Sequence, residues 1–322
     1  MNEDNIVYLA DRARTFLASG QLEDAKTLYA RLCNIDRENE ENWLMLAVVN
    51  GETGQIDEAL HCANQAIELD DTYVEAHLTR AHLLQKAGND EEAVSSALKA
   101  VEIDSGYDEA WLFLSGIAGR LKRFQDAENW AEKAVALLPA SADAHTNLGN
   151  ARYELSKHAE AEESYRKALE LQPEHFQAAL GLAKAVAAQH RFEEAAELLT
   201  PVLQKEPRHS NALDCLATCL MHLKKEDEAR GIFEQITQQD PGYIHAYLHL
   251  ANLHEQQGDY LQALTLLKQA KEIATDPLQV LGALAKIYHD YGMQTQAIEV
   301  CEEALALDAT NTVARFFRAL AI

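Results

Sequence analysis

Residues 142–175 read ADAHTNLGNARYELSKHAEAEESYRKALELQPEH and contain two helical patterns joined by a short polar turn. In the first pattern, the apolar positions include Leu148 and Ala151. The second pattern has apolar residues at i, i+4, i+7 and i+10, which are Ala161, Tyr165, Ala168 and Leu171. This spacing places the side chains on one helix face. Pro173 follows, where the missing N–H of proline costs nothing at a helix end. The segment therefore predicts a helical hairpin.

The same pattern recurs every 34 residues, without insertion or deletion. One position is alanine in every unit: Ala25, Ala59, Ala93, Ala127, Ala161, Ala195, Ala229, Ala263 and Ala297. A second position is always small: Ala13, Ala47, Ala81, Ser115, Gly149, Ala183, Ala217, Ala251 and Ala285. Glycines occupy matching turn positions in five units: Gly20, Gly54, Gly88, Gly258 and Gly292. Such regularity over a fixed period is the signature of a repeat protein.

The small residues have a physical role, because two antiparallel helices can pack about 8–10 Å apart only where the side chains at their crossing are small. Gly149 and Ala161 are expected to let the two helices of one hairpin touch. Together the small residues, the aromatic residue four positions after Ala161 and the closing proline resemble the tetratricopeptide repeat. The resemblance covers nearly the whole chain. It implies an all-α, right-handed α-solenoid, a superhelix of stacked hairpins whose first helices line a concave groove.

The repeat period sets the expected domain boundaries. Residues 1–5 form an N-terminal lead-in, and residues 6–311 hold nine units. The units are expected at 6–39, 40–73, 74–107, 108–141, 142–175, 176–209, 210–243, 244–277 and 278–311. Residues 312–322 then form a partial tenth repeat that acts as a capping helix.

Composition limits the possible partners. The chain has 52 acidic and 28 basic side chains, a net charge of −24, which disfavours nucleic acid and acidic membrane surfaces. No apolar run reaches the ~18–20 residues of a membrane span, and the start lacks the pattern of a signal peptide. The cysteines are odd in number and lie in helical pattern: Cys33, Cys62, Cys215, Cys219 and Cys301. We therefore expect free thiols and a cytoplasmic protein.

Catalytic motifs are not found in the sequence, which has no glycine-rich phosphate loop, GxSxG, HExxH or paired CxxC. We therefore expect no enzyme activity in this chain and no cofactor. A weak metal candidate is formed by Cys215, Cys219 and His222, with His245 and His249 on the next first helix. The favoured interpretation is that the cysteines pack and the histidines line the groove.

The groove residues follow from helical spacing. The candidates for peptide contact are Leu44, Leu78, His82, Lys86, Leu112, Phe113, Arg120, Asn147, Asn150, Tyr153, Lys184 and Leu248. Leucines would hold ligand side chains, while amides and cations would hold backbone or a carboxylate. Equally, the leucines could pack against neighbouring units. The carboxylates Glu41, Glu75, Glu109 and Asp143 recur once per unit. They could bind a basic peptide, but the favoured interpretation is that they stabilise the positive ends of helix dipoles and add solubility.

The function expected is a non-catalytic scaffold that binds a protein or an extended peptide. Two subtypes implied by the family resemblance do not fit. In the first subtype, Lys, Asn and Arg residues from three consecutive units clamp a C-terminal carboxylate, and this set of residues cannot be assembled here. In the second subtype, the glycosyltransferase repeats, an asparagine recurs along the groove, whereas here only Asn147 occupies that position. The alternative is the N-terminal region of a larger glycosyl-, sulfo- or methyltransferase that recruits or presents its protein substrate. The final helix, ARFFRALAI at 314–322, suggests either a continuing chain or self-association through this helix. Its expected inward residues are Ala314, Phe317 and Leu320.

Overall fold

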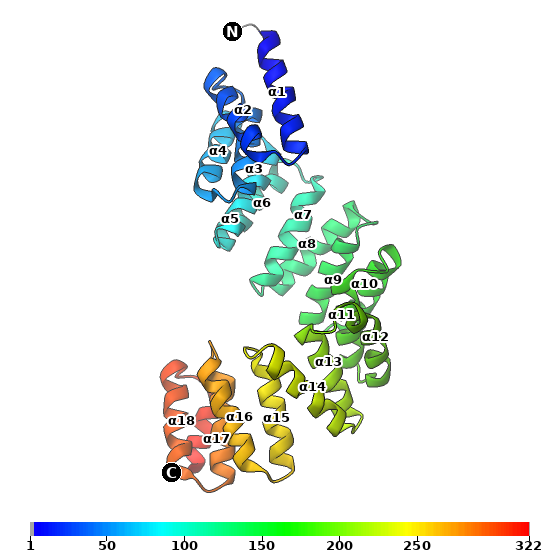
Figure 1. Ribbon diagram of the computed structural model, residues 1–322, viewed down its shortest axis with the longest axis vertical. Coiled ribbons are helices and arrows are strands. Elements are labelled where there is room, and N and C mark those ends of the chain that lie inside the picture. The colour runs from blue at the N-terminus through cyan, green and yellow to red at the C-terminus, as the bar shows by residue number, and fades with distance from the viewer. Residues whose placement is uncertain (1–2, 322) are drawn as a thin grey trace. The chain divides into compact units, whose positions relative to one another are not determined.

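The protein was analysed as a computed structural model, which describes residues 3–321 (Figure 1). Every regular element in that range is an α-helix, and consecutive helices pair as antiparallel hairpins. By its internal contacts the chain divides into two compact units, residues 1–178 and 179–322, which we describe separately. Within each unit the hairpins stack on one another as a solenoid. The all-α repeat architecture predicted from the 34-residue period is confirmed.

The helices are distributed over the two compact units as follows. The first unit contains α1 (Glu3–Ala18), α2 (Leu22–Ile35), α3 (Glu40–Glu52), α4 (Ile56–Leu69), α5 (Val74–Lys86), α6 (Asp90–Ile103), α7 (Asp108–Arg120), α8 (Phe124–Leu137), α9 (Ala142–Glu154) and α10 (His158–Leu171). The boundary between the two units falls inside α11 (Phe176–Ala188). The second unit continues with α12 (Phe192–Lys205), α13 (Ser210–His222), α14 (Glu226–Gln239), α15 (Ile244–Gln256), α16 (Tyr260–Ile273), α17 (Leu278–Asp290), α18 (Gln294–Leu307) and α19 (Thr312–Ala321). Among these helices none is long and apolar enough to cross a membrane.

The small residues of the repeat lie at the helix crossings. The alanines that recur from Ala25 to Ala297 are all 0–1% exposed. In the hairpin of α9 and α10, Gly149 lies directly against Tyr165, whose ring atoms are 2.7–2.9 Å from the position a Cβ on Gly149 would take. Tyr165 is 2% exposed. The close approach expected for Gly149 is therefore present.

All nine turns inside the hairpins contain one residue with positive φ at the same repeat position. Five are the glycines noted in the sequence, and the other four are Lys122, Ser156, His190 and Lys224, with φ of 57–63°. The left-handed residue ends each first helix by allowing backbone N–H groups to bond back to its last turn. Lys122 N–H donates to Gly119 O, and Arg123 N–H donates to Ala118 O. The turn geometry is thus kept even where glycine is absent.

One buried ion pair links neighbouring hairpins of the first unit. Glu128 on α8 is 4% exposed, and both its oxygens accept hydrogen bonds from Lys157 Nζ, at 2.8 and 2.7 Å. Arg152 Nε lies 3.6 Å from the same carboxylate. Burial acts to raise the pKa of Glu128, but the hydrogen bonds and charge of Lys157 outweigh it and the pKa is lowered.

The C-terminal helix α19 packs on α17 and α18. Its inward positions are Ala314, Phe317 and Ala321. Leu320 was expected among them but is 47% exposed, because the spacing i, i+3, i+7 from Ala314 selects Ala321. Phe316 is also exposed, at 59%. Ile322 lies outside the described residues.

Candidate functional site

The leucines proposed for the groove differ in burial. Leu44 and Leu78 are 6% and 4% exposed and belong to core clusters, Leu44 with Ala66 and Ala76. Leu112 and Leu248 are half-buried. The two buried leucines therefore pack between helices and leave little surface for a ligand, which corresponds to the packing alternative considered from the sequence.

Polar groove candidates in the first unit mostly engage the preceding repeat. Lys86 forms an ion pair with Glu52 at 3.1 Å, and Arg120 donates to both oxygens of Asp90 at 3.1 and 3.0 Å. These side chains are at least partly exposed, so the pairs contribute little to stability. The ion pairs restrict the positions of the Lys86 ammonium and the Arg120 guanidinium.

Aromatic groups of the same set also have neighbours. The rings of His82 and Phe113 meet edge-on, 4.5 Å apart, and Phe113 is 9% exposed. Desolvation of the imidazole and the charge of Lys86 lower the pKa of His82. Tyr153 is half-buried, with its ring 5.3 Å from that of His158.

A pocket of about 420 Å³ in the first unit brings three of the predicted residues together. It is formed by α7, α9 and the start of α8. Its lining consists of Ser115, Gly116, Gly119, Arg120, Lys122, Phe124, Ala127, Asn147, Asn150, Ala151 and Glu154. Arg120, Asn147 and Asn150 were predicted for the groove. The two glycines and Phe124 were not, although a glycine pair inside a helix is a signal that could have been used.

Asn147 and Asn150 lie on the same face of α9, three residues apart. Asn147 uses its amide nitrogen, and Asn150 its amide oxygen, for hydrogen bonds within the protein. Asn147 Nδ2 donates to Ser115 Oγ at 2.9 Å and to Leu112 O at 3.5 Å. Asn150 Oδ1 accepts from the Tyr165 hydroxyl at 2.7 Å. Among the described contacts, Asn147 Oδ1 and Asn150 Nδ2 have no partner, so the pocket presents one acceptor and one donor.

A smaller pocket of about 240 Å³ occupies the equivalent place in the second unit, four repeats further along. Its lining is Leu248, Ala251, Asn252, Glu255, Leu267, Ala283, Lys286 and Ile287. Lys286 Nζ forms an ion pair with Glu255 across it. The predicted residue Leu248 thus contributes to a pocket.

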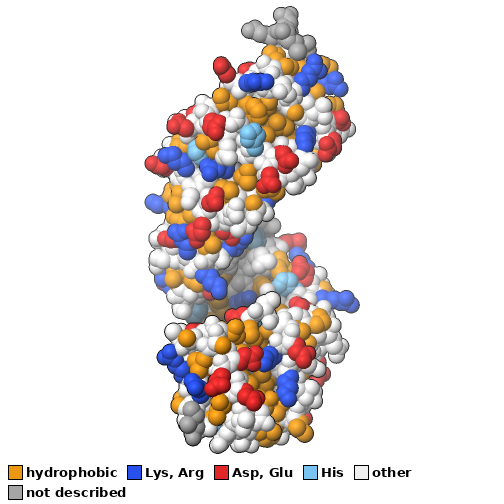
Figure 2. All heavy atoms as spheres, turned by 90° about the vertical axis from the view of Figure 1, so that its left-hand side faces the viewer, with side chains coloured by type: hydrophobic (Ala, Val, Ile, Leu, Met, Phe, Trp, Pro, Cys, Tyr) orange, Lys and Arg blue, Asp and Glu red, His pale blue; other side chains and the backbone are white. Residues whose placement is uncertain are grey.

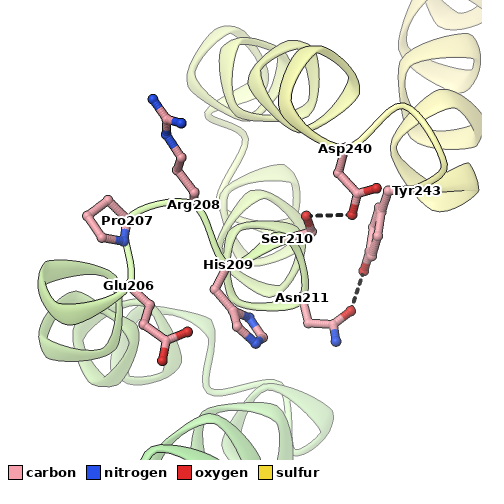
Figure 3. Close-up of a pocket in the computed structure, with 8 residues that line it drawn as sticks. All are labelled: Glu206, Pro207, Arg208, His209, Ser210, Asn211, Asp240 and Tyr243. Carbon is pink, nitrogen blue, oxygen red and sulfur yellow. Dashed lines mark hydrogen bonds between the residues drawn. The ribbon is translucent and has the colours of Figure 1, made fainter.

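The second unit also has an open pocket of about 750 Å³ at the connections between hairpins (Figure 3). Figure 3 shows two hydrogen-bonded pairs on one side of it: Ser210 Oγ donates to Asp240 at 2.9 Å, and the Tyr243 hydroxyl donates to Asn211 at 3.0 Å. Glu206 and Pro207 stand on the other side. None of these residues was among the predicted groove residues, because those candidates were chosen by their spacing along the faces of the first helices.

Lys184, the last groove candidate, lies in the second unit near an unusual carboxylate. Asp214 occupies the position where Leu44, Leu78 and Leu248 stand in other repeats. Burial raises its pKa, while the charges of His249 and Lys184 act in the other direction. Aligning the repeats at a spacing of 34 residues shows that an aspartate replaces leucine at this position. It does not show that the carboxyl group of Asp214 is buried.

The weak metal candidate is not assembled. Cys215 and Cys219 are 8% and 0% exposed, whereas the ring of His222 stacks on Phe192, 4.1 Å away. Within residues 3–321 no three His, Cys, Asp or Glu side chains are placed to hold a metal ion. All five cysteines are buried free thiols.

The repeated carboxylates lie where dipole stabilisation requires. Glu41, Glu75, Glu109 and Asp143 are in the first turns of α3, α5, α7 and α9. Burial, followed by the charges of Glu75 and Glu41, raises the pKa of Tyr73 to about 12.

Comparison with known proteins agrees with this architecture. Family models described as tetratricopeptide repeat match residues 44–108, 142–175, 186–239, 220–287 and 278–311. Among solved structures, pilF of Pseudomonas aeruginosa is 21% identical, with 67% of this chain and 98% of that chain covered and a TM-score of 0.53. Human IFIT1, solved as a dimer with m7Gppp-AAAA, is 19% identical, with 97% of this chain and 79% of that chain covered and a TM-score of 0.59. At these identities the likeness concerns the fold. A search of curated protein sequences gives no match.

Proposed function

Because the chain belongs to the tetratricopeptide repeat family, we propose that it is a non-catalytic scaffold that binds an extended segment of a partner protein. The binding site is the pocket formed by α7, α8 and α9. The observation that carries the proposal is the complementary pair of amide groups left open by Asn147 and Asn150.

A peptide backbone offers one N–H donor and one C=O acceptor at each residue. Asn147 Oδ1 accepts the N–H of a bound segment, and Asn150 Nδ2 donates to its carbonyl. The Tyr165 hydroxyl and Ser115 Oγ hold the two amides in the required orientations, which reduces the ordering cost of binding. Backbone contacts supply affinity, and the pocket beside them supplies side-chain specificity.

Electrostatics favour a protein ligand over a nucleic acid. The net charge is −24. On the face that Figure 2 displays, basic side chains are interspersed with acidic ones. Since phosphate backbones require clustered Lys and Arg, we expect no RNA binding, although IFIT1 was solved with a capped oligonucleotide. A capped RNA is therefore a necessary comparison ligand.

The proposal is tested by selecting a displayed random heptapeptide library against the whole chain and measuring selected peptides by fluorescence anisotropy. Asn147→Ala and Asn150→Ala are each expected to weaken binding about tenfold, because each variant loses one hydrogen bond to the bound segment. Asn129→Ala, an exposed asparagine of α8 outside the pocket, is the matched control and should bind as the wild type does. Equal binding by all three variants, or binding of capped RNA with no peptide enriched, contradicts the proposal.

A further inference from the structure

Gly116 and Gly119 lie three residues apart within α7, where glycine is less favourable than alanine. Neither has the positive φ that would call for glycine. A Cβ on Gly119 would have no atom within 4 Å, and a Cβ on Gly116 would meet only Asn147 Nδ2 at an ordinary 3.6 Å. Packing and backbone conformation therefore do not explain these two glycines.

Every other repeat carries a side chain at one or both of these positions. The residues equivalent to Gly116 are Arg14, Val48, His82, Asn150, Lys184, Thr218, Asn252 and Lys286. Those equivalent to Gly119 are Leu17, Gly51, Gln85, Tyr153, Ala187, Met221, Glu255 and His289. The fourth repeat is the one unit of the nine with glycine at both, and it is here that the 420 Å³ pocket opens.

We propose that this pocket receives an aromatic side chain of the bound segment, a refinement that rests on the peptide-binding function proposed above. The bare backbone at Gly116 and Gly119 leaves room for a flat ring, and Phe124 lines the same pocket. Aromatic rings stack favourably on one another in offset or edge-on arrangements.

The charges around the pocket favour a ring over an aliphatic chain. Arg120 and Lys122 both line it. Arg120 is held by Asp90, while Lys122 has no ion pair among the described contacts. A cation beside a ring face is attracted by the negative face of the π-system, which an aliphatic side chain lacks. The amides of Asn147 and Asn150 hold the backbone next to it.

The experiment uses the whole chain and the displayed heptapeptide library. Wild-type selection is expected to enrich peptides with Trp, Tyr or Phe at one fixed position. Replacing that residue by Leu in a selected peptide should weaken binding about tenfold or more. Gly119→Leu, which fills the pocket, should weaken binding of the same peptide at least as much.

Urea denaturation separates this effect from unfolding, because Gly119→Leu and Gly116→Ala should be as stable as the wild type or more so. Gly231→Ala is the matched control: this exposed glycine of α14 also has no atom within 4 Å of its Cβ and lies outside the pocket. It should raise stability and leave binding unchanged.

The outcomes distinguish the two proposals. Loss of binding in Asn147→Ala with full binding in Gly119→Leu, or enrichment of peptides without an aromatic residue, overturns the assignment of an aromatic side chain to the pocket and leaves the peptide-binding function standing. Failure to enrich any peptide overturns both.

Discussion

Gly149→Ala should destabilise the protein, although alanine is the better helix former. The substitution removes the entropic cost of glycine in α9, a gain of up to about 1 kcal/mol. Against this, the new Cβ would stand 2.7, 2.8 and 2.9 Å from Cε1, Cδ1 and Cζ of Tyr165. Contacts this short force either the ring or one of the helices to move.

The cost of that movement exceeds the gain. Overpacking a core by one methyl group costs about 1–3 kcal/mol. Tyr165 is 2% exposed and its hydroxyl is bound to Asn150 at 2.7 Å, so a shifted ring also loses a hydrogen bond worth about 1 kcal/mol. The expected net loss is about 1–2 kcal/mol.

The assay is equilibrium urea denaturation followed by circular dichroism, with the midpoint compared at unchanged slope. Tyr165→Leu should rescue the defect: the double variant should lose less than the sum of the two single variants. The sixth repeat already pairs an alanine with a leucine at these positions, Ala183 and Leu199, both 0% exposed. If Gly149→Ala is as stable as the wild type, or the two substitutions are additive, the reasoning is refuted.

Three further predictions concern stability, each measured by urea denaturation. Ser156→Gly should raise the free energy of unfolding by about 1 kcal/mol, because φ is 61° there and an L-residue is strained in that conformation. A lower free energy of unfolding would contradict this. Glu128→Gln should lower the free energy of unfolding by about 1–3 kcal/mol at pH 7, because the charged hydrogen bonds from Lys157 are lost. Because the folded pKa of Glu128 is lowered, this deficit should be full above about pH 5 and vanish as pH falls through that pKa. Phe317→Ala, against the last core cluster, should lose about 2 kcal/mol, whereas the exposed Phe316→Ala should change little.

The fold could be predicted from the sequence because its determinants recur. The alanine series from Ala25 to Ala297 needs one residue type at one spacing, and every member is buried. The turns were predictable only in part. Five carry glycine, but Lys122 and Ser156 adopt the same left-handed conformation without any local signal. Their geometry follows from the repeat as a whole, which fixes how the chain must reverse.

The candidate site was less predictable, because burial depends on what a neighbouring helix places opposite. Helical spacing puts Leu44 and Leu112 at equivalent positions, yet Leu44 is in the core and Leu112 is half-buried. The same spacing gives the face of α9 on which Asn150 lies, where the structure has a pocket, but it does not give the bond of Asn150 to Tyr165. A periodic pattern gives the direction of a side chain and leaves its partners undetermined.

The groove positions also limit how a partner can be held. The position of Asn147 is filled in the other repeats by Asp11, Met45, Thr79, Phe113, Gly181, Cys215, His249 and Ala283. An asparagine there, followed by another three residues later, occurs in one repeat of nine. A long ligand therefore cannot gain the same pair of backbone hydrogen bonds at successive repeats. On the peptide-binding function proposed above, these backbone contacts are confined to the segment beside Asn147 and Asn150, and we expect a short peptide to retain most of the affinity of the partner that contains it.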